Sequence, residues 1–260
     1  MKDITIQGIN WDAKSSFQRG PAKAPDLIRK ALYSDSMNLY TELGTSIEND
    51  AVIDKGDFII NEYFDIETIT KKNIESGSKL LSLGGDHSVT FPIIKALHEH
   101  YPKLDILHID AHADLYHDYE GDPYSHACPF ARIMENGYAV KLVQVGIRTL
   151  NPHQADQAKK YNVDVHEMRN LDLNAIPKFE NPLYISLDMD GFDPAFAPGV
   201  SHHEPGGLSS RQVLDLIHGI DTEVVGADIV EYNPDRDFHD MTAYLAAKMM
   251  KELLGKLMGN

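Results

Sequence analysis

The sequence predicts a three-layer α/β/α fold around a mainly parallel sheet of about eight strands. Short β-rich runs alternate with amphipathic stretches along the chain, as expected when helices cover both faces of a parallel sheet. The 260 residues, of which 42% are hydrophobic, are enough to build one large core. Because the chain contains no internal repeat and no low-complexity linker, we expect a single domain that spans residues 1–260.

The predicted strands are short runs rich in apolar and β-branched residues. They cover residues 3–8, 79–83, 104–110, 141–147, 163–166, 183–188 and 223–230, and an eighth is predicted near residues 39–43. The predicted helices carry apolar residues three and four positions apart and cover residues 24–33, 66–76, 91–100, 209–220 and 241–258. We expect Ser209 and Asp240 to cap the last two helices.

Two segments between these elements are predicted to be loops. Residues 49–67 are rich in Asp and Glu and only weakly periodic, so we expect a surface loop there. Residues 193–207 contain three prolines and three glycines directly after a predicted strand. This composition predicts an ordered loop that forms one wall of a site.

The charge balance restricts the partners of the chain. There are 24 basic and 40 acidic residues, which give a net charge of -16. This charge repels phosphate backbones and anionic membranes and attracts small cations, so we expect neither nucleic acid nor a membrane as partner. No uncharged apolar run approaches the roughly 18 to 20 residues that are needed to span a bilayer.

Cysteine content and the first ten residues bear on location. Cys128 is the single cysteine, so no intramolecular disulfide can form and nothing favours an oxidising compartment. The first ten residues lack the basic and apolar regions of a signal peptide. We therefore expect a cytoplasmic location.

A group of chemically active residues follows the predicted strand 104–110. Asp110, His112 and Asp114 are spaced two residues apart, so in an extended chain they point to one side. Two carboxylates and an imidazole that are buried together would cost several kcal/mol without a positive charge between them. The spacing therefore predicts a metal site.

Two other predicted strands end in similar residues. Asp188 and Asp190 lie where the run 183–188 ends, and His87 follows two glycines after the run 79–83. Ligands of open α/β sheets bind outside the carboxyl ends of the strands, so these groups can converge on one crevice. Taken singly, each motif has a simpler interpretation as a turn or a helix cap.

The donor set indicates which metal and which reaction to expect. Four carboxylates and two imidazoles form a hard oxygen and nitrogen shell that suits two divalent ions, and Mn²⁺ fits best, with Ni²⁺ and Co²⁺ left open. Two such ions about 3.5 to 4 Å apart would lower the pKa of a water between them, which makes hydrolysis the natural reaction.

These motifs together resemble those of the ureohydrolase family, which contains arginases and agmatinases. The similarity rests on GGDHS at 84–88, DAHAD at 110–114 and SLDMDGFDP at 186–194, and it extends from about residue 80 to the C-terminus. The stretches 124–127 and 197–202 look most like plant-type arginases.

The resemblance implies roles for particular residues. His87 and Asp114 would bind one Mn²⁺, His112 and Asp190 the other, and Asp110 and Asp188 both. His126 would pass a proton to the leaving amine, as a neutral imidazole that titrates near pH 6.5. Glu231 would grip the guanidinium group, and Asp114 would act with these two as a catalytic residue. Asn151 and His202 would contact the substrate. Family members often form homo-oligomers, so a trimer or hexamer is expected.

The substrate is expected to be a small cationic guanidino compound. We favour L-arginine, cleaved to ornithine and urea, over agmatine or another guanidino compound. Asn151 stands where animal-type arginases have aspartate, and the short loop 116–125 carries Asp118, Glu120 and Asp122, which would also suit a tail without a carboxylate. Two other classes of protein remain as alternatives: a non-catalytic regulatory relative, and a cysteine hydrolase that uses Cys128 with His126.

Overall fold

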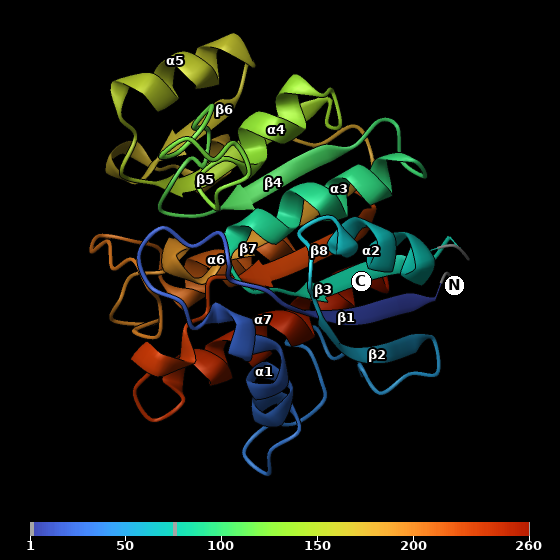
Figure 1. Ribbon diagram of the computed structural model, residues 1–260. Helices are drawn as coiled ribbons and strands as arrows, with labels where there is room; N and C mark the ends of the chain where they lie inside the picture. The colour runs from blue at the N-terminus through green and yellow to red at the C-terminus, as the bar shows by residue number, and fades with distance from the viewer. Residues whose placement is uncertain (1–2, 75–76, 260) are drawn as a thin grey trace.

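The computed structural model describes residues 3–74 and 77–259, which form one eight-stranded sheet with helices on both faces (Figure 1). The strands are β1 (Ile4–Asn10), β2 (Val52–Ile59), β3 (Lys79–Leu83), β4 (Asp105–Ile109), β5 (Lys141–Ile147), β6 (Asp164–Glu167), β7 (Leu183–Asp188) and β8 (Val224–Val230). Their order across the sheet is β2-β1-β3-β8-β7-β4-β5-β6. Every neighbouring pair is parallel, so all strands end at the same edge.

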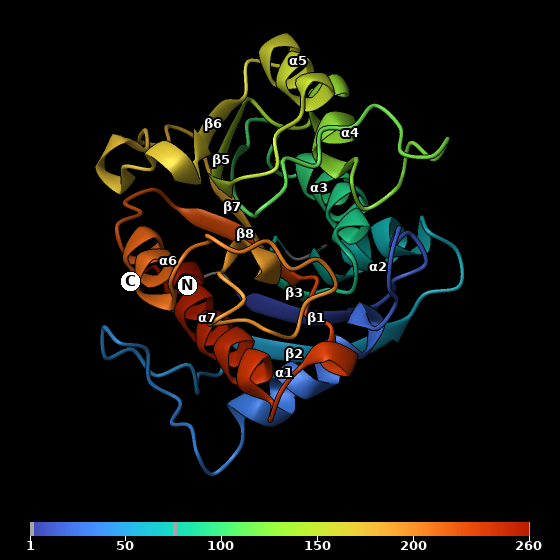
Figure 2. The ribbon, with the colours of Figure 1, turned by 90° about the vertical axis from the view of Figure 1, so that its left-hand side faces the viewer.

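The helices form two layers on opposite faces of this sheet. One layer contains α1 (Ala24–Leu32), α6 (Ser210–His218) and α7 (Met241–Leu257), and the other contains α2 (Asp65–Ile74), α3 (Thr90–His98) and α4 (Pro129–Glu135), with α5 (Pro152–Lys160) beside β5 and β6 (Figure 2). Successive strand residues point to opposite faces and join different cores, as Leu80 and Leu81 do. The predicted three-layer fold is confirmed.

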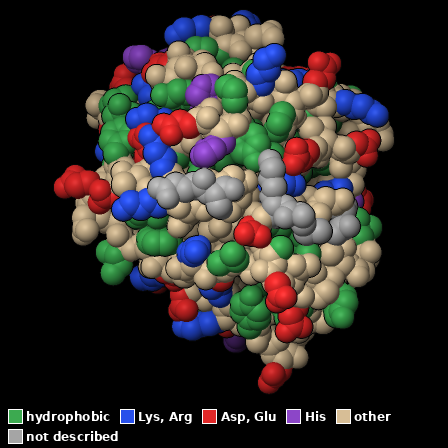
Figure 3. Space-filling model, turned by 90° about the vertical axis from the view of Figure 1, so that its right-hand side faces the viewer, with side chains coloured by type: hydrophobic (Ala, Val, Ile, Leu, Met, Phe, Trp, Pro, Cys, Tyr) green, Lys and Arg blue, Asp and Glu red, His purple; other side chains and the backbone are tan. Residues whose placement is uncertain are grey.

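The face of the molecule at the amino ends of the strands carries acidic and basic side chains that are interspersed (Figure 3). The acidic excess of the chain does not form a single continuous patch there. Within residues 3–74 and 77–259, no helix is long and apolar enough to cross a membrane.

Seven of the eight predicted strands match β1 and β3 to β8 within two residues, and the eighth is wrong. Near residues 39–43, Tyr40 makes only an isolated bridge to Ser46. The strand of the sheet that we did not predict is β2, which lies inside the segment 49–67 that we expected to be a loop. As an edge strand, β2 pairs only with β1 and leaves most side chains exposed, so its sequence lacks the apolar alternation that predicts strands.

The predicted helices correspond to α1, α2, α3, α6 and α7, and two more helices were not predicted. The predicted end of α2, residues 75 and 76, lies outside the described residues. The first unpredicted helix, α4, has only seven residues, and the second, α5, is polar over most of its surface, so neither shows a clear helical period.

The two predicted helix caps differ in outcome. Ser209 caps α6 through a capping box with Gln212, as expected. Asp240 occupies the N-cap position of α7 but makes no side-chain cap, so that prediction is wrong. The carboxylate of Asp237 accepts hydrogen bonds from the backbone N–H groups of Thr242 and Ala243 instead.

Candidate metal centre and active site

The six predicted ligands lie together at the carboxyl edge of the sheet. Strands β3, β8, β7 and β4 are neighbours there, and the chain leaves each of them toward the same side (Figure 2). The six come from the 3-10 turn after β3, the segment after β4, and the end of β7: His87, Asp110, His112, Asp114, Asp188 and Asp190. All are buried except His112, which is partly exposed.

His87 is surrounded by carboxylates. Its Nδ1 lies 3.1 Å from an oxygen of Asp110, 3.1 Å from Asp114 and 3.0 Å from Asp188. None of these contacts has hydrogen-bond geometry, so the buried Nδ1 has no hydrogen-bond partner among the described residues. A ring nitrogen and three converging carboxylate oxygens are the environment of a cation.

A buried network behind His87 fixes which ring nitrogen carries its proton. The Ser186 hydroxyl donates to Asp228 at 2.7 Å, and it lies 3.0 Å from His87 Nε2. Because the Ser186 proton is directed to Asp228, its oxygen accepts from His87 Nε2–H. The unprotonated Nδ1 therefore presents its lone pair to the carboxylates, an arrangement that a metal cation between them would stabilise. Asp228 also accepts hydrogen bonds from Thr90 and Tyr184.

His112 forms the second half of the cluster. Its Nδ1 lies 3.1 Å from Asp190 and 3.4 Å from Asp110. Asp110 therefore faces both imidazoles, one with each carboxylate oxygen. Asp188 contacts His87 through one oxygen, and its other oxygen accepts the backbone N–H of Asp190 at 2.7 Å.

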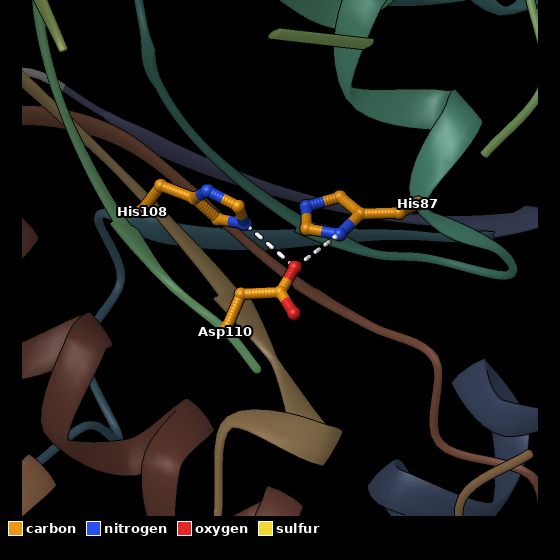
Figure 4. A group of neighbouring side chains, drawn as sticks. All are labelled: His87, His108 and Asp110. Atoms are coloured by element: carbon orange, nitrogen blue, oxygen red, sulfur yellow. Dashed lines mark hydrogen bonds and ion pairs between the residues drawn. The ribbon is translucent and has the colours of Figure 1, made fainter. Parts of the chain in front are cut away.

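His108 is a further member of the cluster that we did not predict. Its Nε2 lies 2.7 Å from the Asp110 oxygen that also faces His87 (Figure 4). The Gln144 amide nitrogen donates to the Ala113 carbonyl and to His108 Nδ1, so His108 donates from Nε2 to Asp110. Burial lowers the pKa of His108, which keeps this ring neutral. His108 and Asp110 are two residues apart on a strand, a spacing that could have indicated their common side.

The carboxylates of the cluster repel one another. Burial raises the pKa of Asp188 well above its ordinary value, and the charges of Asp190 and Asp110 add to this effect. Burial also raises the pKa of Asp190, to about 6. Crowded, buried carboxylates of this kind are stabilised when divalent cations lie between them. The residues present thus fit a metal centre of oxygen and nitrogen ligands.

Glu231 and His126 lie at the same cavity as the cluster. Glu231 follows β8 with a left-handed backbone (φ 62°), a conformation that costs a non-glycine residue about 1 to 2 kcal/mol. Its Oε1 accepts the backbone N–H of His87 at 2.9 Å and lies 2.8 Å from His126 Nδ1. The arginine nearest to Glu231 in the sequence, Arg236, does not pair with it, because its guanidinium lies 3.4 Å from His203 Nδ1.

The surroundings of His126 bear on the charge of its ring. Burial lowers its pKa, but the adjacent Glu231 carboxylate outweighs burial and raises the pKa to about 9. This pKa favours a charged ring at neutral pH, whereas the hydrogen bond that Nε2 accepts from the Ser16 backbone N–H fits the neutral ring that we expected. His126 Nε2 accepts this Ser16 backbone N–H at 3.2 Å and lies 2.8 Å from the Ser16 hydroxyl oxygen.

The segment 11–20 brings one residue, Ser16, to the wall of the cavity, which the sequence did not indicate. The Asp86 carboxylate accepts the backbone N–H of Lys14 at 2.9 Å, which holds this segment over the site. Gly85 allows the approach, because a Cβ there would lie 1.5 Å from the Trp11 carbonyl oxygen. Ser16 comes to the cavity in this way, from a loop with no recognisable motif.

The two residues predicted to contact the substrate lie in different places. His202 lines the cavity, with its ring centroid 5.4 Å from that of His126, and burial lowers its pKa. Asn151 is not among the lining residues, so its expected role is not supported. Its side chain caps α5 by accepting the Gln154 backbone N–H at 2.9 Å, and it donates to the Tyr116 hydroxyl.

Cys128 lies outside the site. It is fully buried, donates to the Asp122 carbonyl at 3.7 Å and is not among the residues that line the cavity. Burial raises the pKa of its thiol to about 12, which suppresses the nucleophilic thiolate. A cysteine hydrolase is therefore disfavoured.

Known proteins that are similar to this chain identify its family and share its fold. The model of the arginase family matches residues 2–255. A mitochondrial arginase of Medicago truncatula is 46% identical over 97% of this chain and 81% of its own length. An agmatinase of Bacillus anthracis is 34% identical over 97% of this chain and 91% of its own length. The solved structure of Medicago truncatula arginase superimposes with a TM-score of 0.92 at 41% identity, covering 98% of this chain and 87% of that one.

The expected cytoplasmic location is contradicted by these relatives. The similar arginases from Medicago truncatula, Arabidopsis thaliana and rice are named as mitochondrial, or as chloroplastic and mitochondrial. A single cysteine and the absence of a recognisable signal at the first residues do not discriminate among these compartments. The family match and these identities, by contrast, settle what kind of protein this is: the chain belongs to the arginase family and is a ureohydrolase.

Proposed function

We propose that this chain is a manganese-dependent arginase that hydrolyses L-arginine to ornithine and urea. The observation that carries the proposal is the shared cavity: a cage of four carboxylates and two imidazoles opens to the same space as Glu231 and His126. Arginine is favoured because the plant relatives with 42 to 46% identity are named arginases.

Two Mn²⁺ ions fit the cage by its chemistry. His87, Asp114 and the shared Asp110 and Asp188 would hold one ion, and His112 and Asp190 would hold the other with the same shared residues. When bound, the ions would make a water nucleophilic near neutral pH and stabilise negative charge in the transition state. All six side chains are present and face one another, which argues against a non-catalytic relative.

Glu231 is the group that would bind the guanidinium. A guanidinium is charged at all biological pH values and presents a planar fork of N–H donors, so a carboxylate can accept two parallel hydrogen bonds from it. The Glu231 backbone N–H donates to the Gly85 carbonyl at 2.9 Å, which anchors the residue at the rim of the cage. The guanidino carbon would then face the metal centre.

His126 would supply the proton to the leaving amine. Its Nδ1–H beside the Glu231 carboxylate holds a proton on the side of the cavity where the guanidinium would bind. The arriving guanidinium shares the same carboxylate, and its positive charge lowers the pKa of His126 from about 9 toward neutrality. The ring is thereby brought into the range in which it can release and regain a proton.

Agmatine is the second candidate substrate. Among the described residues, no lysine or arginine lines the cavity to pair with the α-carboxylate of arginine. Relatives named agmatinase and N(1)-aminopropylagmatine ureohydrolase also match the chain.

Two further expectations stay predictions. The first is a homo-oligomer, trimer or hexamer, and the second is a single domain over residues 1–260.

Urea release tests this proposal directly. The purified chain, loaded with Mn²⁺, is offered arginine, agmatine and other guanidino compounds side by side. We expect the highest kcat/KM with arginine, loss of urea release after complete chelation, and recovery when Mn²⁺ is returned. No urea from any compound would overturn the proposal, and activity that survives complete metal removal would overturn the metal mechanism.

A further inference from the structure

One carboxylate of the cavity wall has no role in the chemistry described so far. The cavity is lined by five acidic residues, of which Asp114, Asp188 and Asp190 belong to the metal cage and Glu231 pairs with His126. The fifth is Glu204. Its side chain is partly exposed and has no hydrogen bond or ion pair to any described residue.

The backbone at Glu204 is held firmly although its side chain is free. The Arg148 guanidinium donates to the Glu204 carbonyl at 2.7 Å and to the Asp190 carbonyl at 2.7 Å. The Asp193 carboxylate accepts the backbone N–H groups of Gly206 and Gly207 at 2.6 and 3.0 Å. These bonds tie the backbone of the loop that carries Glu204 to the same turn that carries Asp190, so the Glu204 side chain starts from a fixed point beside the cage.

The remaining lining residues leave Glu204 without a neutralising partner. Arg148, the nearby cation, is fully engaged with backbone carbonyls. Burial lowers the pKa of His202, so its neutral ring provides no positive charge. An unpaired, partly buried carboxylate at a cavity favours a cationic ligand over a neutral or anionic one.

We infer that Glu204 is the specificity residue for the tail of the substrate, where it pairs with an ammonium group. The inference rests on the proposed guanidino hydrolysis, because the guanidinium end is assigned to Glu231. The ammonium can be the α-amine of arginine or the terminal amine of agmatine. A tail that ends in a carboxylate alone finds no lysine or arginine side chain among the described residues of the cavity wall.

A series of guanidines with different tails tests this inference. Agmatine, n-pentylguanidine and 4-guanidinobutyrate share the reacting group and end in an ammonium, a methyl and a carboxylate, and arginine is the fourth substrate. In Glu204→Gln we expect kcat/KM for agmatine and arginine to fall about ten- to hundredfold, because hydrogen bonds to charged groups contribute roughly 1.5 to 3 kcal/mol. The value for n-pentylguanidine should stay within about twofold.

Two further variants sharpen the test. Glu204→Lys should raise kcat/KM for 4-guanidinobutyrate relative to agmatine, because the charge at the tail is reversed. Glu180→Gln is the control. It removes the same charge from an exposed position before β7, at the opposite edge of the sheet, and should leave kcat/KM for every substrate unchanged.

Each outcome decides the inference. If kcat/KM of Glu204→Gln falls equally for all four substrates, or does not fall for agmatine and arginine, the role of Glu204 is overturned. If the unmodified chain releases no urea from any guanidine, the proposed function fails instead. In that case, calorimetry measures the binding of agmatine and n-pentylguanidine to the unmodified chain and to Glu204→Gln. If Glu204 pairs with the ammonium group, the substitution weakens the binding of agmatine and leaves that of n-pentylguanidine unchanged.

Discussion

The inner part of the cavity and its outer wall are built in different ways. The inner cage uses residues at the ends of adjacent parallel strands, such as Asp110 and Asp188, and these are buried and supported from behind. The outer wall uses Ser16 from one irregular loop, and His202 and Glu204 from a second loop far from it in the sequence. If the proposed function holds, the sheet positions the residues of the hydrolytic chemistry, and the loops position the residue that we infer to select the substrate tail.

The largest effect is expected when a carboxylate of the inner cage is removed. Asp188→Asn should lower urea release about a thousandfold, because metal centres contribute several kcal/mol of transition-state stabilisation. Metal analysis should show fewer bound ions per chain. When a chelator has removed the metal, the same variant should melt at a higher temperature than the unmodified chain. The reason is that the neutral amide is not repelled by Asp190 and Asp110, whose charges help to raise the pKa of Asp188.

An unchanged metal content in Asp188→Asn, or a lower melting temperature without metal, would contradict this account of the cage. Glu180→Gln again serves as the matched control, since it removes an equal charge at an exposed site.

Glu231→Gln separates substrate binding from metal binding. The variant should retain its metal and lose about a hundredfold in kcat/KM, because a neutral amide cannot accept two charge-assisted hydrogen bonds from a guanidinium. Metal analysis and steady-state kinetics measure the two properties. Full turnover in this variant would refute the assigned role of Glu231.

Asp228→Asn tests the support behind the cage. The substitution breaks the pattern in which Ser186 donates to Asp228 and accepts from His87, so the Nδ1 lone pair is no longer fixed toward the cage. We expect metal affinity to fall about ten- to hundredfold, a typical effect of removing an outer partner of a ligating histidine. Titration with Mn²⁺ measures the affinity, and an unchanged value would show that the network does not orient His87.

The pH dependence of stability tests the pair His126 and Glu231. Because the pKa of His126 is raised to about 9 in the folded state, its contribution to stability is complete below about pH 6.5 and is lost as the pH rises through 9. The metal-free chain should therefore lose more stability between pH 6.5 and 10 than Glu231→Gln does. Equal losses in thermal melts of the two proteins would show that the pair is not coupled.

The smallest effect is expected for Cys128→Ala. Its thiol is buried away from the cavity, so kcat/KM should be unchanged, while the small space left behind lowers the free energy of unfolding by about 1 kcal/mol. Kinetic assays and denaturant unfolding measure the two quantities. Loss of turnover with metal still bound would restore the cysteine mechanism as a candidate.

The sequence predicted the inner cage because its residues follow local rules. Asp110, His112 and Asp114 alternate after a strand, and parallel strands end at one edge, so spacing along the chain translates into proximity. His108 and Asp228 obey the same rules, as charged or polar groups inside apolar strands, and could have been found.

The outer wall could not be predicted in this way. Ser16 reaches His126 across 110 positions of sequence, through a loop held by Asp86, and Asn151 serves a helix start rather than the cavity. The edge strand β2 was missed for a related reason, since its side chains face solvent and leave no apolar pattern. Where neither burial nor strand geometry constrains a segment, its position depends on tertiary contacts.

The contact at Gly85 has a consequence for how such a protein can diversify. Its carbonyl accepts from Glu231, and the neighbouring Asp86 N–H donates to Trp11, so segments after β1, β3 and β8 meet at one junction. Beyond this junction, the loops can change in length and sequence while the ligand spacing is preserved. If the proposed function holds, we expect changes in the outer loops to alter the substrate preference while the metal ligands stay in place.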